Sequence, residues 1–272
     1  MNKGLKRSFQ FCLLLFVVGL GGMLWLFVQR DPFAVSLLPV NEQHTIAESV
    51  KALQVSTSTA DVILSPSQSD QTSIRLSGRV VQARKDDLQL NSEVTPDGTL
   101  HVEVRELREM EMLWTDNRYL QLEIFLPATE TGYDSVHIQT STGDIQTGAL
   151  SAKRGDIRSS TGDILVGGFT GEEVELATQT GDIILENLRA ALRAKSSTGD
   201  VEVRRMPEFV HDVSIATNTG DVELSVIAQP TSARLRLLSD TGDVRVDWPQ
   251  VMETDTAPAL SVETVTGDIW IQ

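Results

Sequence analysis

The chain has 272 residues, a net charge of −15 at pH 7 and a single cysteine. This acidity argues against a nucleic-acid partner and against direct adhesion to anionic phospholipid. One cysteine excludes an intrachain disulfide framework, so burial of apolar side chains must hold the fold together.

The first residues form a separate segment. Basic Lys3, Lys6 and Arg7 precede an apolar run over residues 9–28, which is long enough to cross a bilayer as one helix. The basic flank predicts a cytoplasmic N-terminus and an extracytoplasmic C-terminal part in the cell membrane. A cleaved signal peptide is the alternative, but no Ala-x-Ala-like cleavage site follows the run. We therefore expect residues 1–30 to be a cytoplasmic tip and a retained single-pass transmembrane anchor.

Three further regions are predicted after this anchor. Residues 31–48 contain prolines among polar residues, which is typical of a linker. Residues 49–135 are expected to hold degenerate coils and capping strands, and residues 136–272 the regular repeats. Within the middle region, Leu53–Leu64 is a degenerate copy of the repeat, and Pro96-Asp97-Gly98 reads as a turn between two strands.

The tripeptide Thr-Gly-Asp organises the C-terminal half. It occurs seven times at spacings of 18 to 25 residues, which is typical of a stacked repeat. Counted from each Gly, position −3 is Ser or Thr, position −5 is apolar, and position +2 is Ile or Val. Such alternation indicates strands with one buried face, and its parity changes at Gly-Asp, so the chain must turn a corner there. The corner residues are Gly143, Asp144, Gly162, Asp163, Gly181, Asp182, Gly199, Asp200, Gly220, Asp221, Gly242, Asp243, Gly267 and Asp268.

A coil of about 20 residues cannot bury its own apolar face, so coils must stack with parallel strands about 4.8 Å apart. The sequence therefore predicts an all-β fold: a parallel β-solenoid (β-helix) of Thr-Gly-Asp repeats behind one N-terminal transmembrane helix. The residues at position +2 should form one buried column. Its members are Ile145, Ile164, Ile183, Val201, Val222 and Val244.

Two expectations concern the connections and the last coil. The return loops Glu186–Ala194 and Met206–Asp212 are long enough for a short helical turn. The last coil reaches Gln272 four residues after its Asp, so we expect it to present an open edge with Trp270 and Ile271.

The repeated Ser/Thr-x-Thr-Gly-Asp-Ile/Val strands behind one membrane helix resemble a bacterial domain-of-unknown-function family of candidate adhesins. LiaG-type membrane-anchored envelope proteins belong to that family, and the resemblance covers about Leu53 to Gln272. It implies a surface-exposed solenoid at the cell envelope with a link to envelope-stress response. It does not imply a biochemical activity.

The corner carboxylates allow two interpretations. Asp61 and the seven repeat Asp residues would lie about 5 Å apart if the coils stack in register. One interpretation is a row of weak Ca²⁺ sites, since carboxylates that close need compensation. The other is structural: each Asp accepts backbone N–H groups, and the Ser or Thr at −3 and the Thr at −1 point inward and bond to the neighbouring coil. We favour the structural interpretation, because the glycine-rich nonapeptide of calcium-binding β-rolls is absent.

Other candidate chemistry is weaker. Arg154-Gly155-Asp156 matches an integrin-binding tripeptide, but it falls within a predicted strand. The four histidines show no metal-ligand spacing, and no Gly-x-Ser-x-Gly nucleophile motif occurs. We therefore predict no catalytic residues, no metal site and no cofactor.

The function expected from these observations is non-enzymatic. The exported part would be an adhesin-like binding or scaffold module whose partner, from the cell wall or a protein, contacts one sheet face or the return loops. An accessory protein of envelope-stress sensing is the first alternative. A carbohydrate-active β-helix enzyme is the second, disfavoured because Trp114, Trp248 and Trp270 are scattered along the chain.

Overall fold

The computed structural model describes residues 37–81, 88–106, 119–127, 132–248 and 251–272. All the regular elements in these ranges are β-strands, joined in a 19-stranded and mostly parallel sheet, so the all-β prediction is confirmed. In this part of the chain the structure contains no helix that could span a bilayer. The predicted anchor over residues 9–28 lies outside the described residues.

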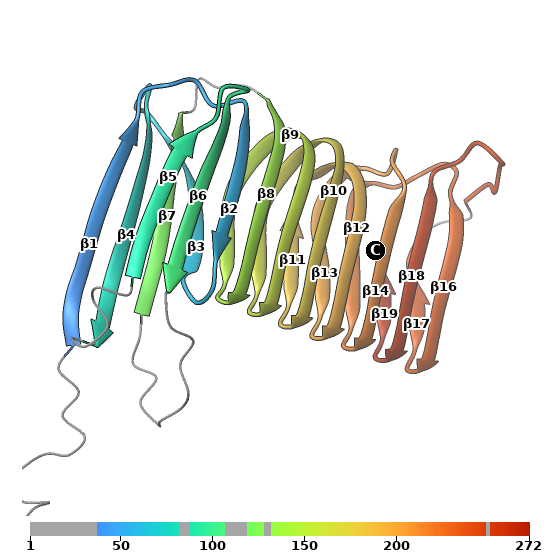
Figure 1. Ribbon diagram of the computed structural model, residues 1–272. Helices are drawn as coiled ribbons and strands as arrows, with labels where there is room; N and C mark the ends of the chain where they lie inside the picture. Colours follow the sequence, from blue (N-terminus) through green and yellow to red (C-terminus); the bar gives the residue numbers. More distant parts are fainter. Residues whose placement is uncertain (1–36, 82–87, 107–118, 128–131, 249–250) are drawn as a thin grey trace, which may run out of the picture.

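The strands form two faces that meet at the Thr-Gly-Asp corners (Figure 1). Strands before each corner pair into face one, and strands after it pair into face two, while β9 and β10 contribute to both. Apolar side chains from the two faces meet between them and make one continuous core.

Face one contains, in spatial order, β5 (Leu88–Val94), β6 (Thr99–Glu106), β2 (Ala52–Thr57), β8 (Tyr133–Thr142), the second parts of β9 (Ile145–Thr161) and β10 (Ile164–Thr180), β12 (Leu188–Thr198), β14 (Val213–Thr219), β18 (Ala259–Thr266) and β16 (Arg234–Thr241). Face two contains β1 (Leu37–Ile46), β4 (Thr72–Val81), β7 (Tyr119–Pro127), β3 (Asp61–Ser67), the first parts of β9 and β10, β11 (Ile183–Glu186), β13 (Val201–Glu208), β15 (Val222–Ala228), β19 (Ile269–Ile271) and β17 (Val244–Val246).

Glycine is required at the corners for two reasons. Gly181 has φ +142°, a conformation that side chains with a Cβ rarely adopt. A Cβ at that position would also lie 2.2 Å from the carbonyl oxygen of Gly162 in the preceding coil. The same close approach recurs through the stack, so the Gly column sets how tightly successive coils pack.

The column at position +2 is buried along most of its length. Ile145, Ile164 and Ile183 are fully buried, and Val201 and Val222 are 1% exposed. Val244 is the exception at 46% exposed, so its predicted burial is wrong. It lies in the coil at the end of the stack, where no further coil covers it.

The order of coils in space differs from their order in the sequence. β18 lies between β14 and β16, and β19 lies between β15 and β17. The coil of β18 and β19, which is last in the sequence, thus lies between the coil of β14 and β15 and the coil of β16 and β17. The expectation of an open edge at Trp270 and Ile271 is therefore wrong, since Ile271 is 1% exposed and the outermost strands are β16 and β17.

Antiparallel strands terminate the opposite end of the stack. β1 pairs with β4, β4 with β7, and β5 with β6, all antiparallel. His44 of β1 and Ser92 of β5 are hydrogen-bonded at 2.6 Å and so join the two faces. We call this the closed end, and the end formed by β16 and β17 the open end.

Two local expectations differ from the structure, and a third is confirmed. Residues 37–46, expected to belong to the linker, form β1, because alternate residues such as Val40 and Ile46 bury apolar side chains against the core. The return loops around Leu188 and Met206 continue as strand rather than forming a helical turn, since both side chains face the core. The turn at Pro96-Asp97-Gly98 is confirmed by the β5–β6 pairing.

Candidate functional site: the corners and the outer faces

The corner carboxylates form a ladder along the stack. Asp163 Oδ1 accepts the backbone N–H of Asp182 at 2.8 Å, and Asp182 Oδ1 accepts that of Asp200 at 2.8 Å. The same bond links every successive pair of corners. The ladder runs through Asp61, Asp144, Asp163, Asp182, Asp200, Asp221, Asp268 and Asp243 at 2.7–3.0 Å.

A second ladder of hydroxyl groups lies beside it. Thr178 Oγ1 donates to the carbonyl oxygen of Gly162 at 3.1 Å, and Ser196 Oγ donates to that of Gly181 at 3.1 Å. Ser159, Thr217, Thr264 and Ser239 make the same bond to the Gly one coil away. Thr140 is buried, but its Oγ1 has no partner among the described residues.

The Thr at position −1 differs from the expectation. Its side chain is exposed in all seven repeats, whereas it was predicted to point inward. The corner therefore starts one residue earlier than the alternation suggested. Position −1 lies where the two faces converge, so there is no interior at that point to receive the side chain.

This geometry decides what the corners can do chemically. One oxygen of each internal carboxylate is held by a backbone N–H, which compensates its charge without a cation. In the described part of the chain no group of three or more His, Cys, Asp or Glu side chains is arranged as a metal site. The corner bonds match the structural interpretation of Gly143 to Asp268, in which each Asp accepts a backbone N–H of the neighbouring coil.

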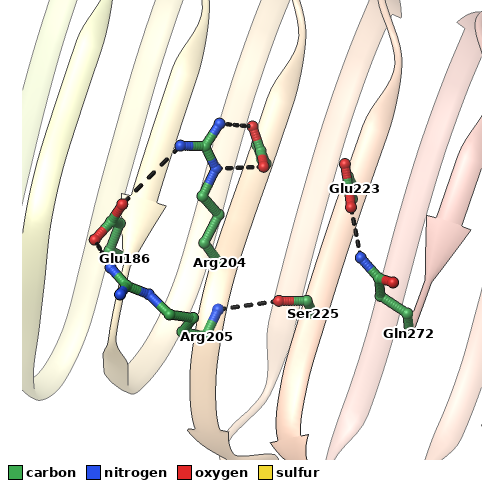
Figure 2. Close-up of polar contacts among 7 residues, drawn as sticks. Glu186, Arg204, Arg205, Glu223, Ser225 and Gln272 are labelled. Carbon is green, nitrogen blue, oxygen red and sulfur yellow. Dashed lines mark hydrogen bonds and ion pairs between the residues drawn. The ribbon is translucent and has the colours of Figure 1, made fainter.

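Face two carries a network of charged side chains between coils (Figure 2). Arg204 makes a bidentate pair with Glu202 and lies 4.0 Å from Glu186 of the neighbouring coil, while Arg205 bonds to Glu186 as well. The bond to Glu202 raises the pKa of the Arg204 guanidinium. Arg205 has φ +53° at a register shift, and its N–H donates to Ser225 Oγ at 3.0 Å. These bonds fix the outer side chains to one another across three coils.

Face one carries a comparable row. Asp156 Oδ2 lies 3.1 Å from His137 Nδ1, and Asp156 Oδ1 accepts from Arg158 Nε at 2.5 Å. Arg158 also lies 3.1 Å from Glu175, and the bond to Asp156 raises the pKa of its guanidinium. The carboxylate of Arg154-Gly155-Asp156 is thus engaged within a strand that is paired on both sides, unlike a tripeptide displayed on a loop.

A hollow interrupts face one next to this row. Its volume is about 550 Å³, and it lies where β10 and β12 shift register between Thr170 and Glu173. Glu173 and Arg193, on the adjacent strands β10 and β12, line it and form an ion pair at 3.8 Å, and Asp212 Oδ1 accepts the N–H of Ala259 at 2.7 Å in the same lining. The charged lining residues are Arg154, Glu172, Glu173, Arg193 and Asp212.

Sequence reasoning placed the corners but missed these outer side chains. Position +5 of two neighbouring repeats holds Glu186 and Arg204, so aligning the outward positions as well as the inward ones predicts their contact. The hollow leaves no such signal, because it depends on a register shift between strands. The four histidines lie on separate elements, with His137 paired to Asp156 and His44 to Ser92.

Several solved bacterial structures are similar to this chain. A candidate adhesin from Bacteroides fragilis is 15% identical over 88% of this chain and 99% of its own, with a TM-score of 0.47. A candidate adhesin from Parabacteroides merdae is 11% identical over 85% of this chain and 95% of its own, with a TM-score of 0.42. A candidate lipid-binding protein from Parabacteroides distasonis is 14% identical over 85% and 96%, with a TM-score of 0.46.

No curated protein matches the sequence significantly. The model of the family described as Toastrack DUF4097 matches residues 50–271, which include every Thr-Gly-Asp corner. The resemblance inferred from the repeats is thereby confirmed. This chain belongs to the Toastrack DUF4097 family.

Proposed function

We propose that this chain is an extracytoplasmic binding module that is held at the cell membrane by residues 9–28. The observation that carries the proposal is the charged hollow on face one. Its volume of about 550 Å³ lies within the usual range of ligand pockets, about 300–1,000 Å³. Its lining is charged with both signs, so it suits a polar partner that offers both hydrogen-bond donors and acceptors.

Strand pairing supports this proposal by fixing the backbone around the hollow. β10 pairs with β12 and β12 with β14, and Asp212 Oδ1 accepts the N–H of Ala259 at 2.7 Å. Preorganised polar groups lose little conformational entropy on binding, which favours affinity. A face of paired strands with a charged hollow is the arrangement expected of a docking surface or scaffold.

Cell-wall fractions provide the test. The full-length protein in detergent is expected to co-sediment with a wall fraction, and the double variant Glu173→Ala/Arg193→Ala is expected to weaken this at least tenfold. Arg245→Ala is the matched control, because Arg245 is exposed on face two and away from the hollow. If the double variant and the control co-sediment equally, the binding surface lies elsewhere. If the wild-type protein does not co-sediment with the wall fraction, the proposal of a wall partner is contradicted.

Membrane attachment is a separate part of the proposal. The basic residues before the apolar run favour a retained anchor with the solenoid outside. Full-length protein is expected to stay in the membrane fraction after carbonate extraction, and protease added to intact cells is expected to digest the solenoid. A mature N-terminus near Asp31 would instead show that the run is cleaved.

A further inference from the structure

The open end leaves apolar side chains in solvent. Leu235 is 38% exposed, while Leu260, its register partner one coil inward, is fully buried. Leu238, whose side chain points to the outer surface of face one, is 44% exposed. Val244 on face two is 46% exposed beside its fully buried partner Ile269. The open end thus resembles a cross-section through the core.

The outer edge of β16 also leaves backbone groups without strand partners. β16 pairs with β18, and no other described strand pairs with it. The N–H of Arg234 donates to the carbonyl oxygen of Pro258 on the β18 side at 3.0 Å. The backbone N–H and C=O groups of even-numbered residues therefore face β18, and those of odd-numbered residues face the open edge. Soluble proteins protect such edges with proline, with charged side chains or by covering them. β16 contains no proline, so any protection of its edge comes from its charged side chains.

The outward side chains of β16 are complementary to themselves. Arg236, Leu238 and Asp240 are all exposed on the outer surface of face one. Neither Arg236 nor Asp240 makes an ion pair within the described ranges. If a second copy of β16 lies antiparallel and is centred on Leu238, Arg236 of each copy faces Asp240 of the other, and the two Leu238 side chains face each other.

The register is selected by the same two charges. Centring the pair on Arg236 or on Asp240 places like charges opposite each other, which is unfavourable. Centring it on Leu237 places Arg236 opposite Leu238 and leaves its charge unpaired. Among the registers near the middle of the strand, the Leu238-centred one places Arg236 of each copy opposite Asp240 of the other, so both charges are paired in both copies.

We propose that the open end is a self-association surface, on which β16 of a second copy of this chain pairs antiparallel and centred on Leu238. The contact continues face one across a two-fold axis and covers Leu235 and Leu238 in both copies. Arg236 and Asp240 form two reciprocal ion pairs. The two closed ends then lie at opposite ends of the dimer.

Disulfide cross-linking tests the register directly. Because Leu238 bonds inward, the two Leu238 residues form a non-hydrogen-bonded pair with Cα atoms about 4.5 Å apart, within the disulfide range. In full-length protein carrying Cys12→Ser, Leu238→Cys is expected to give a disulfide-linked dimer under mild oxidation. Val210 is 59% exposed and is not part of β16, so the Val210→Cys variant is expected to form no disulfide-linked dimer. Equal cross-linking of both variants, or of neither, would overturn the proposal.

Charge reversal provides the second test. Arg236→Asp and Asp240→Arg are each expected to weaken the dimer at least tenfold in analytical ultracentrifugation of the full chain in detergent, because each places like charges opposite each other. The double variant is expected to restore it, because the reciprocal pairs re-form with opposite sign. Arg79→Asp, on β4 at the closed end, is the control and should leave the dissociation constant within about twofold of wild type.

Association through residues 9–28 would be the same in all of these variants, so differences among them report on β16 alone. Thermal melts identify any variant that fails to fold. A wild-type chain that stays monomeric at about 100 μM, or a dimer that neither single reversal affects, would overturn the proposal. Capture of a foreign strand by a monomeric chain would likewise replace the second copy as the occupant.

Discussion

The two ends of the stack solve the same problem differently. At the closed end the strands turn antiparallel, and the bond between His44 and Ser92 brings the two faces together over the core. At the open end the coil of β16 and β17 keeps the parallel repeat and leaves Val244 46% exposed. Ile145 holds the equivalent position near the closed end and is fully buried. Burial in this fold is therefore set by the neighbouring coil, and the repeat motif alone does not determine it.

Edge protection also differs between the ends. β1 carries Pro39, which cannot donate a hydrogen bond to an added strand, and its outward positions are mostly polar. β16 contains no proline, and its outward side chains Arg236, Leu238 and Asp240 can pair with those of a second copy. The difference is what makes the open end a candidate for self-association and the closed end a terminus. Stability should follow the same division, since each coil is supported only by its neighbours.

The largest expected effect is at an internal corner. Gly181→Val should destabilise the fold by about 3 kcal/mol or more, because it combines an unfavourable φ with a contact to the carbonyl of Gly162. Gly242→Val meets a similar contact, but local detachment of the open-end coil relieves it. Urea unfolding of both variants measures the difference. An equal loss at the two positions would mean that the open-end coil is as firmly held as the interior.

A smaller difference is expected in the core column. Ile183→Ala should cost about 2–5 kcal/mol, the usual range for truncating a buried Ile. Val244→Ala should cost well under 1 kcal/mol, because its side chain is already half in solvent. The urea midpoint is again the measurement. An unchanged midpoint in Ile183→Ala would show that the buried face has been assigned wrongly.

The carboxylate ladder should respond more weakly. Asp182→Ala removes the acceptor for the N–H of Asp200 and should cost about 1 kcal/mol, whereas Asp182→Asn should cost less because its amide oxygen still accepts. Asp243→Ala at the open end should have almost no effect. Thermal melts with Ca²⁺ and with chelator complete the test. A large Ca²⁺-dependent rise in the wild type that Asp182→Asn reduces would favour cation sites instead.

The smallest effect concerns the hairpin of the closed end. Hydrogen bonds from Thr95 and then from Thr99 lower the pKa of Asp97. A lowered folded-state pKa contributes stability above the unfolded pKa, and this is lost as the pH falls through the folded value. NMR titration should show Asp97 ionising below its ordinary range in wild type and nearer to it in Thr95→Ala. No difference between the two proteins would mean that Thr95 does not hold the carboxylate.

The sequence was informative wherever one residue type is required at every coil. Gly at the corner, Ile or Val at +2 and the hydroxyl at −3 each meet a constraint that every coil repeats, so alignment of the repeats found them. A bond from the hydroxyl at −3 to the neighbouring coil was predicted on this basis, and at six corners the structure shows it donating to the Gly carbonyl oxygen there.

The remaining features depend on which coil lies next to which. The repeat motif is the same at Gly242 and Gly267. Nothing in it shows that the coil of Gly267 lies between the coil of Gly220 and the coil of Gly242. The exposure of Val244 and the burial of Ile271 follow from that exchange. The hollow at Glu173 depends in the same way on a register shift between neighbouring strands, which alternation within one strand does not encode.

The inserted coil has a consequence for how the protein folds. The coil of β16 and β17 precedes the coil of β18 and β19 in the chain, yet it stacks outside it. Before β18 is in place, the matching corner of β16 can bind β14 in the same register, giving a compact and competing state. Native folding then requires β16 to dissociate, and we expect a slow kinetic phase that a deletion of β16 and β17 would remove.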